Sequence, residues 1–511
     1  MKPQSFLKGA LIITLGGIAA KLLGAFYRIP LTNILGGEGM GIYQMVYPLY
    51  CLLLTISATG IPSGLARLIS QAEKKGGGAS EGILKKSLTL FAAIGLIGSA
   101  AMFFIAPFMS AAQSEPGAVT AYRMLAPSVF FVSVISCFRG YFQGKSNFYP
   151  TALSEIAEQI VKIGLGLFFA RVFRANVQAA VSYALFSVTI SELAACAFMV
   201  VLALGERGKK PLYRVRTSRP HALYLLRVTV PVTIAAGILP LSGILDSILI
   251  VNLVGRYADN ATALYGLYSG GAATVVNLPV SICYGLAAAS VPAVSSLFAE
   301  NRTSEGEDRI LFALKCTLFV AFPAAFFLFA FPGQVASFLF PSVTGEEGRA
   351  LASLVRALSF AALSLSCVQT LSACLTGRGK PKIAALSMTA AVALKILLEV
   401  FLLRVPQISV SGAAYASMAC YFVALFVNLL YSIRERKTRL RAYGLFLKFS
   451  LMSVTAVGVA FPLGRVHVLA ALAAAGVVYL ALAVLLHAFT GEELRAFTRR
   501  KKHDHRHRIG V

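Results

Sequence analysis

The sequence is poor in charged residues and contains no tryptophan. Only 13% of its 511 residues are charged, whereas soluble domains average about 25%. Several soluble domains would fit a chain of this length, but there is too little polar surface to solvate them. With 57% hydrophobic residues, the composition predicts an integral membrane protein.

Acidic residues are also scarce, with 21 Asp and Glu against 47 Lys and Arg, a formal net charge of +26. In a soluble protein this excess would suggest nucleic-acid binding. Here the basic residues gather in loops between apolar stretches, so we expect no nucleic-acid partner. The eight cysteines occur singly, without a CxxC pair, and we interpret them as buried free thiols rather than disulfides or metal ligands.

Apolar stretches long enough to cross a bilayer recur along the whole chain. A spanning helix needs about 20 mostly apolar residues, and fourteen stretches meet this condition. They lie at about 6–29, 40–62, 85–108, 121–142, 151–171, 179–204, 223–252, 264–290, 310–331, 350–374, 383–403, 409–432, 443–463 and 467–488. The sequence therefore predicts an all-α membrane protein with 14 transmembrane helices and no soluble domain larger than a loop.

Lys and Arg alternate between the two sides of these stretches. Both chain ends and every second loop together hold 35 of the 47 basic residues, and the intervening loops hold six. Loops rich in Lys and Arg face the cytosol. We therefore predict a multi-pass protein of the bacterial cytoplasmic membrane with both termini cytosolic.

The chain contains an internal repeat. Residues 123–171 align without a gap on 356–404 after a shift of 233 positions, which pairs Arg123 with Arg356, Lys162 with Lys395 and Arg171 with Arg404. The paired stretches are six helices apart, so both copies have the same orientation in the membrane. This predicts two six-helix lobes related by a pseudo-twofold axis along the membrane normal, with two C-terminal helices outside the repeat.

The repeat sets the expected domain organisation. The N-terminal lobe would occupy residues 1–205 and the C-terminal lobe residues 223–433, with a basic cytosolic linker at 206–222 between them. The last two helices would occupy 434–490, followed by a basic cytosolic tail at 491–511.

The first apolar stretch carries two basic residues. Lys21 and Arg28 are seven residues apart, so they share one stripe of a helix. A charge at the helix centre costs about 2.5–3.5 kcal/mol on insertion scales, which favours an anion-binding cavity. Gly24 and Pro30 could bend or break the helix there. The alternatives are that Lys21 snorkels or meets a carboxylate and that Arg28 ends the helix.

Two further stretches carry basic and acidic residues at i,i+4 spacing. Glu158 precedes Lys162, and Lys395 precedes Glu399. Each pair can neutralise itself within its own lobe. Coupling of transport to an ion or a proton through Glu158 or Glu399 is the alternative.

Three other polar residues are candidates for the cavity. Asp246 lies in the middle of stretch 223–252 and could pair with Lys21 or Arg28, bind a coupling cation or form a local hydrogen bond. Asn252 follows it in the same stretch. Arg67 at the cytosolic end of 40–62 could bind an anionic head group, although the cytosolic bias explains it equally well.

Motifs of soluble enzymes are absent. Gly377-Arg378-Gly379-Lys380 lacks the Walker spacing, and no strand precedes the glycine-rich segment 36–41. We expect no catalytic residue, no metal and no cofactor, and the histidines of the tail are interpreted as part of a solvated basic segment. Transport would then draw on the membrane potential, H⁺ or Na⁺.

Several motifs resemble one family of membrane proteins. The stretch RGYFQG at 139–144, followed by PTALSE at 150–155 and Glu158-Gln159, is similar to the signature of bacterial polysaccharide-export proteins and lipid-linked oligosaccharide flippases. Segments 6–31, 35–43 and 277–279 also match. The sequence most resembles the stage V sporulation protein B branch, which is related to the MurJ lipid II flippases of the MATE/MOP superfamily.

This resemblance implies the MOP flippase fold and alternating access. The substrate would be a lipid-linked oligosaccharide carried on undecaprenyl pyrophosphate, such as lipid II or a related wall or polysaccharide precursor. Membrane lipids and cell-wall synthesis enzymes are candidate partners. The predicted cavity residues are Lys21, Arg28, Arg67, Asp246 and Asn252.

Two other classes of function compete with this one. A cation-coupled MATE-type drug exporter would share the architecture but would need acidic cavity residues, and stretch 6–29 has none. A scaffold or a glycosyltransferase-type enzyme is the other alternative. An enzyme would need a loop with catalytic carboxylates, and the most acidic loop, 300–308, is short and mixed with Arg.

Overall fold

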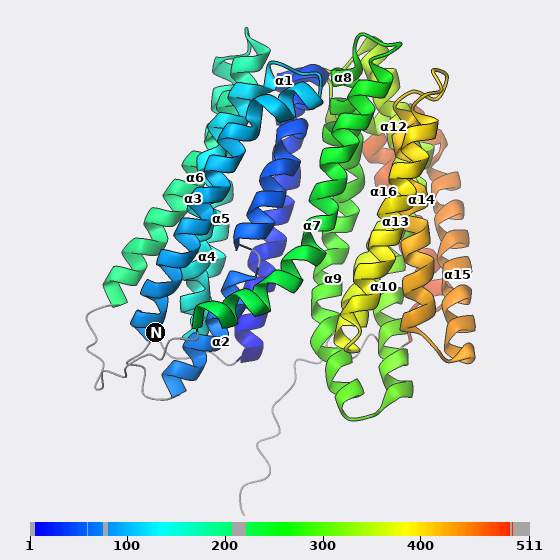
Figure 1. Cartoon of the computed structure of the whole chain (residues 1–511). Helices are drawn as coiled ribbons and strands as arrows, with labels where there is room; N and C mark the ends of the chain where they lie inside the picture. Colours follow the sequence, from blue (N-terminus) through cyan, green and yellow to red (C-terminus); the bar gives the residue numbers. More distant parts are fainter. Residues whose placement is uncertain (1–5, 59, 75–79, 207–220, 491–492, 494–511) are drawn as a thin grey trace, which may run out of the picture.

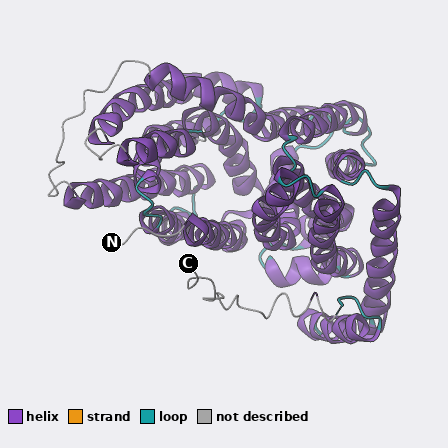
Figure 2. Cartoon of the chain, turned by 90° about the horizontal axis from the view of Figure 1, so that it is seen from below, coloured by secondary structure: helices purple, strands orange, loops and turns teal. Residues whose placement is uncertain are grey.

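The described part of the protein consists of helices joined by short connections (Figures 1 and 2). The computed structural model describes residues 6–490 except 59, 75–79 and 207–220, together with residue 493. The central part of the expected linker and the basic tail, apart from residue 493, therefore lie outside the described residues. No β-strand occurs among the residues described.

The helices follow the order expected from hydropathy. The N-terminal half contains α1 (Phe6–Ala58), α2 (Ile61–Lys74), α3 (Ser80–Ala112), α4 (Ala118–Gly144), α5 (Tyr149–Val172) and α6 (Val177–Glu206). The second half contains α7 (His221–Val254), α8 (Ala261–Gly266), the π-helix η1 (Leu267–Ala272), α9 (Ala273–Ala299), α10 (Thr303–Ala330), α11 (Pro332–Leu339), α12 (Gly345–Gly377), α13 (Pro381–Leu402) and α14 (Ser411–Ser432). The chain continues with α15 (Arg436–Ala460), the 3₁₀ turn η2 (Pro462–Arg465) and α16 (Val468–Leu485).

The fourteen predicted crossings are confirmed. Twelve helical segments are long and apolar enough to cross a membrane, and the first of them, Leu22–Lys74, contains two crossings. The helix α5 supplies the remaining crossing, with Glu155, Glu158 and Lys162 in its central part. The second crossing continues beyond the predicted residue 62 into the amphipathic α2, and the stretch predicted at 264–290 contains η1 and α9.

The break in α1 lies at Gly36, not at Gly24 or Pro30. Gly36 has φ 70° and ψ −173°, whereas the helix continues through Pro30 and Pro48. A positive φ is open to glycine at little cost because it has no Cβ. At 1.5 Å per residue, an unbroken α1 of 53 residues would be far longer than a bilayer is thick. Gly36 therefore divides α1 into two helices that cross separately.

The internal repeat has a structural counterpart in the two lobes. Gly144 ends α4 and packs on α2, where a Cβ would meet Ile69 at 2.5 Å. Its repeat mate Gly377 ends α12 and packs on the end of α9, where a Cβ would meet the carbonyl oxygen of Val291 at 2.8 Å. Equivalent glycines thus permit the same close helix contact in both lobes.

The last two helices pack on the outside of the second lobe. The hydroxyl of Tyr479 in α16 donates a hydrogen bond to the carbonyl oxygen of Phe319 in α10 at 3.0 Å. Lys315 of α10 forms an ion pair with Glu493 at 2.7 Å. All eight cysteines are free thiols, six of them buried, as the sequence predicts.

Candidate functional site

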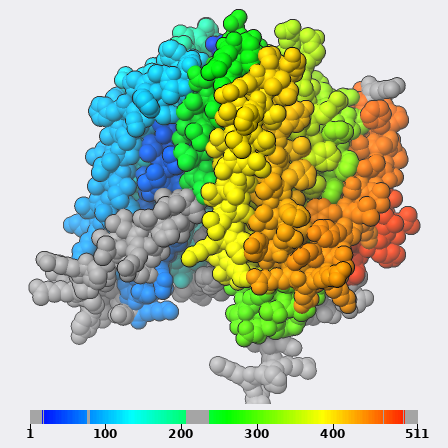
Figure 3. All heavy atoms as spheres, turned by 45° about the vertical axis from the view of Figure 1, so that its right-hand side comes forward, coloured from blue at the N-terminus to red at the C-terminus, as the bar shows by residue number. Residues whose placement is uncertain are grey.

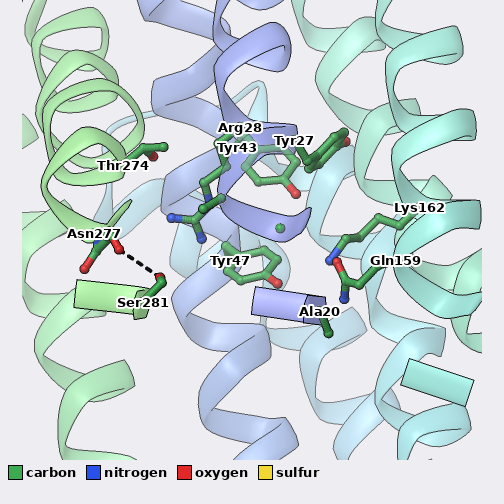
Figure 4. Close-up of a pocket in the computed structure, with 12 residues that line it drawn as sticks. Ala20, Tyr27, Arg28, Tyr43, Tyr47, Gln159, Lys162, Thr274, Asn277 and Ser281 are labelled. Atoms are coloured by element: carbon green, nitrogen blue, oxygen red, sulfur yellow. Dashed lines mark hydrogen bonds between the residues drawn. The ribbon is translucent and has the colours of Figure 1, made fainter. Parts of the chain in front are cut away.

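A cavity of about 340 Å³ lies between the two lobes (Figure 4). The first lobe contributes α1 and α5 to its wall, and the second lobe contributes α9. The lining residues are Ala20, Gly24, Ala25, Tyr27, Arg28, Tyr43, Tyr47, Gln159, Lys162, Thr274, Asn277 and Ser281. A site built from both lobes changes shape whenever the lobes move relative to each other.

Arg28 and Lys162 give the cavity its charge. Figure 4 shows the guanidinium of Arg28 and the amine of Lys162 pointing into the cavity from α1 and α5. The Arg28 guanidinium lies 5.7 Å from the centre of the Tyr47 ring, within range of a cation–π interaction. Among the described residues, no carboxylate lies within ion-pair distance of either cation, and no carboxylate lines the cavity.

The expected pair between Glu158 and Lys162 does not form. Glu158 instead pairs with Arg139 of α4 at 3.1 Å, and Arg139 also donates to the hydroxyl of Ser154 at 3.1 Å. The spacing of four residues would permit an ion pair along α5. The carboxylate of Glu158 instead binds the guanidinium of Arg139 on the neighbouring helix α4. Lys162 is left facing the cavity.

Neutral polar groups complete the wall. Gln159 belongs to α5, while Thr274, Asn277 and Ser281 belong to α9. The amide oxygen of Gln159 and the hydroxyl of Thr274 are buried and have no hydrogen-bond partner among the described residues. Buried polar atoms are nearly always paired with protein or water, so these two atoms identify the cavity as a place for a polar ligand or solvent.

Asp246 does not line the cavity, and among the described side chains it forms no ion pair with Arg28. It lies on α7, next to α13 (Figure 3), and forms an ion pair with Lys395 inside the second lobe. Lys395 also lies 3.5 Å from Glu399, so the predicted i,i+4 pair of α13 is confirmed. Both carboxylate oxygens of Glu399 lack a hydrogen bond within the described chain. The cluster therefore contains two carboxylates and one ammonium group.

The other predicted site residues lie away from the cavity or outside the description. Arg67 is exposed on α2 and is not part of the wall. Asn252 donates to the carbonyl oxygen of Ala112 at 2.8 Å and accepts from Ser114 at 2.9 Å, so it connects the lobes near the ends of α3 and α7. The side chain of Lys21 lies outside the described residues, although Ala20 and Gly24 beside it line the cavity.

The family of the chain follows from its sequence relatives. A model of polysaccharide biosynthesis proteins matches residues 6–298, more than half of the chain. This chain belongs to the polysaccharide biosynthesis protein family. Stage V sporulation protein B of Bacillus subtilis (strain 168) is 30% identical over 353 residues, which cover 67% of this chain and 68% of that protein. The lipid II flippase MurJ of the same organism is 24% identical over 456 residues, covering 84% and 82%.

Solved structures show the same fold at low identity. A structure of lipid II flippase MurJ in an inward closed conformation has a TM-score of 0.71 at 15% identity and covers 96% of this chain and 100% of that one. An inward-facing MATE multidrug transporter of the MOP superfamily has a TM-score of 0.68 at 16% identity, covering 83% and 95%. The predicted MOP fold is thereby confirmed.

In this member of the family the lobes are joined where α1 meets α8, at the upper end in Figure 1. Ser342 donates to the side-chain oxygen of Asn33 at 2.6 Å, and Gln44 donates to the carbonyl oxygen of Ser269 at 2.8 Å. Thr262 donates to Glu115 at 2.9 Å. The backbones also touch, because a Cβ on Gly266 would lie 2.0 Å from the carbonyl oxygen of Gly37. We call these contacts the joined face.

Sequence reasoning missed most of the neutral cavity wall. Tyr43 and Tyr47 are four residues apart on α1, and their rings stack with centroids 5.8 Å apart. Thr274, Asn277 and Ser281 recur at i, i+3 and i+7 on α9. This helical spacing of polar residues within an apolar span was the signal that could have identified them.

Proposed function

We propose that this protein is a flippase that moves an undecaprenyl-pyrophosphate-linked saccharide, such as lipid II or a related precursor, across the cytoplasmic membrane by alternating access. The observation that carries this proposal is the cavity between the lobes, in which Arg28 and Lys162 face no carboxylate of the described part of the chain. Buried charges at membrane depth are costly and mark substrate pathways. A pyrophosphate group would neutralise both cations.

The geometry supports a cycle in which the two lobes rock around the head group. With both termini in the cytosol, as the Lys and Arg bias indicates, the joined face is the outer one and the cavity loads from the cytosolic side. The prenyl tail would stay in the bilayer between the lobes. Opening of the joined face would then expose the head group outside, where cell-wall synthesis enzymes would act as partners.

A cation-coupled drug exporter fits this cavity less well. Arg28 and Lys162 repel a cationic drug. Glu158, the acidic residue nearest to Lys162 in sequence, already forms an ion pair with Arg139. The MATE neighbour shares the fold at 16% identity, and a fold alone does not determine a substrate. We therefore expect no transport of cationic dyes by the purified protein.

The energy source is proposed from the second lobe. The cluster of Asp246, Lys395 and Glu399 carries one more carboxylate than ammonium groups. A buried excess charge favours uptake of a proton or another cation, so this cluster is our candidate for coupling to H⁺, Na⁺ or the membrane potential. A Glu399→Gln variant whose flipping rate keeps the full dependence on the imposed gradient would exclude it.

The direct test is flipping of labelled lipid II in proteoliposomes. Arg28→Ala and Lys162→Ala should each lower the rate about 10-fold or more, because a charge-assisted hydrogen bond contributes about 1.5–3 kcal/mol. Arg441→Ala is a matched control, since it removes an exposed arginine that pairs with Asp308 at 2.7 Å outside the cavity. Wild-type rates in both cavity variants would contradict the proposal.

A further inference from the structure

The two lobes contribute different chemistry to the cavity between them. Both cations, Arg28 and Lys162, come from the first lobe. The second lobe contributes Thr274, Asn277 and Ser281, which are all neutral and come from one helix. This division raises the question of which part of a ligand each lobe binds.

The three residues of α9 form one stripe. At 100° per residue, positions 277 and 281 lie within about 60° of position 274 around the helix axis. Figure 4 shows them along the side of the cavity opposite Lys162. The hydroxyl of Ser281 donates to the backbone oxygen of Asn277 at 2.8 Å, which fixes its direction and leaves its oxygen free to accept a further hydrogen bond.

Two polar groups of this stripe lack a partner within the described chain. Thr274 is only 1% exposed, and its hydroxyl forms no hydrogen bond there. The amide of Asn277 is half-buried and faces the cavity. Hydroxyl and amide groups both donate and accept hydrogen bonds, as do the hydroxyl and acetamido groups of sugars. An ionised phosphate offers only hydrogen-bond acceptors, so Arg and Lys side chains bind it better than neutral hydroxyl or amide groups do.

We infer that Thr274, Asn277 and Ser281 form the sugar-reading wall of the cavity, while Arg28 and Lys162 hold the pyrophosphate. This inference rests on the proposed function and adds the orientation of the substrate. The pyrophosphate lies toward α1 and α5, and the first sugars lie toward α9. The substrate thus bridges the lobes, and the second lobe selects saccharide-bearing lipids against bare prenyl pyrophosphate.

The tyrosine stripe of α1 supports this orientation. Tyr43 and Tyr47 stack nearly parallel, with an angle of 15° between their rings, and both line the cavity, where Figure 4 shows them between Lys162 and the residues of α9. An aromatic surface with a hydroxyl at its edge combines an apolar face with a polar handle. The apolar C–H face of a sugar ring fits against such a surface.

The test compares two lipids that share the undecaprenyl pyrophosphate, of which one carries a saccharide head group and the other does not. Purified protein in nanodiscs is titrated with lipid II and with undecaprenyl pyrophosphate. Asn277→Ala and the nearly isosteric Thr274→Val should each weaken lipid II binding about 5- to 10-fold and leave binding of undecaprenyl pyrophosphate within about 2-fold. Arg28→Ala should weaken binding of both lipids.

A serine on the same helix is the matched control. Ser290→Ala removes a hydroxyl that donates to the carbonyl oxygen of Leu286 at 2.7 Å and does not line the cavity, so it should change neither affinity. If both α9 variants weaken the two lipids equally, or weaken neither, the sugar-reading wall is refuted while the flippase proposal stands. If the wild-type protein binds neither lipid, the flippase proposal itself fails.

Discussion

Two glycines bring the backbones of the lobes into contact at the joined face. A Cβ on Gly41 of α1 would lie 2.1 Å from the carbonyl oxygen of Thr262, and a Cβ on Gly266 of α8 would lie 2.0 Å from that of Gly37. The obstacles are backbone atoms, which no rotamer change can move. We therefore predict that Gly41→Ala destabilises the joined face selectively.

The magnitude follows from the overlap. A carbon–oxygen contact needs about 3.3 Å, so the two helices must separate by more than about 1 Å. Overpacking of this kind costs about 1–3 kcal/mol, and 1.4 kcal/mol is a tenfold change in an equilibrium. The population with the lobes joined should fall about 5- to 150-fold relative to the separated arrangement.

Disulfide cross-linking across the joined face measures this population. Asn33 and Ser342 are in direct contact, with 2.6 Å between their side-chain oxygens, so Asn33→Cys combined with Ser342→Cys should cross-link readily under a mild oxidant. The half-buried Cys51 and Cys196 are first replaced by serine. Adding Gly41→Ala should lower the cross-linking rate about 5-fold or more.

The control is a glycine with open space around it. Nothing lies within 4 Å of a Cβ built on Gly164 of α5, so Gly164→Ala should leave cross-linking unchanged and gain about 1 kcal/mol of helix propensity. Both variants are compared by thermal unfolding in detergent. If Gly41→Ala is folded and cross-links at the rate of Gly164→Ala, the glycine contact does not hold the lobes together.

Three substitutions test polar contacts of the second lobe, within it or to α15, all by unfolding in detergent. Lys395→Met should lower the unfolding free energy by about 3–5 kcal/mol, because it leaves the buried carboxylates of Asp246 and Glu399 without a cation. Adding Asp246→Asn removes one of these charges and should restore part of the lost stability. Glu307→Ala should cost about 3–5 kcal/mol, since this carboxylate forms a buried ion pair with Arg378 at 3.1 Å and accepts from two backbone N–H groups just before α15 at 2.9–3.0 Å. Asp308→Asn breaks an exposed ion pair to the same helix and should cost less than about 1 kcal/mol.

The crossings could be predicted from local composition, and the repeat from an alignment of the sequence with itself. A bilayer requires about 20 apolar residues per helix, and a conserved register of Arg and Gly is visible without coordinates. The break in α1 was placed wrongly because proline is tolerated inside a helix when neighbouring elements satisfy the freed backbone groups. Gly36, by contrast, must adopt a positive φ.

The partners of buried charges depend on which helices are neighbours, and spacing along one helix does not determine this. Glu158 was expected to pair with Lys162, yet it forms its ion pair with Arg139 on α4. Asp246 was a candidate partner of Arg28, but α7 packs beside α13 and presents Lys395 instead. Arg28 lines the cavity, and its role in binding a substrate stays a prediction, based on the cost of a cation in the middle of an apolar helix.

The two lysines of the repeat show how one fold can give its lobes different roles. Lys162 and Lys395 occupy equivalent positions, 233 residues apart. Lys395 is held by Asp246 and Glu399, whereas Lys162 faces the cavity without an ion pair among the described residues. Among the described residues, the positive charge of the cavity therefore comes from the first lobe. An anionic head group held there can stay with that lobe while the neutral wall of the second lobe swings away, so release requires only that hydrogen bonds to α9 are broken.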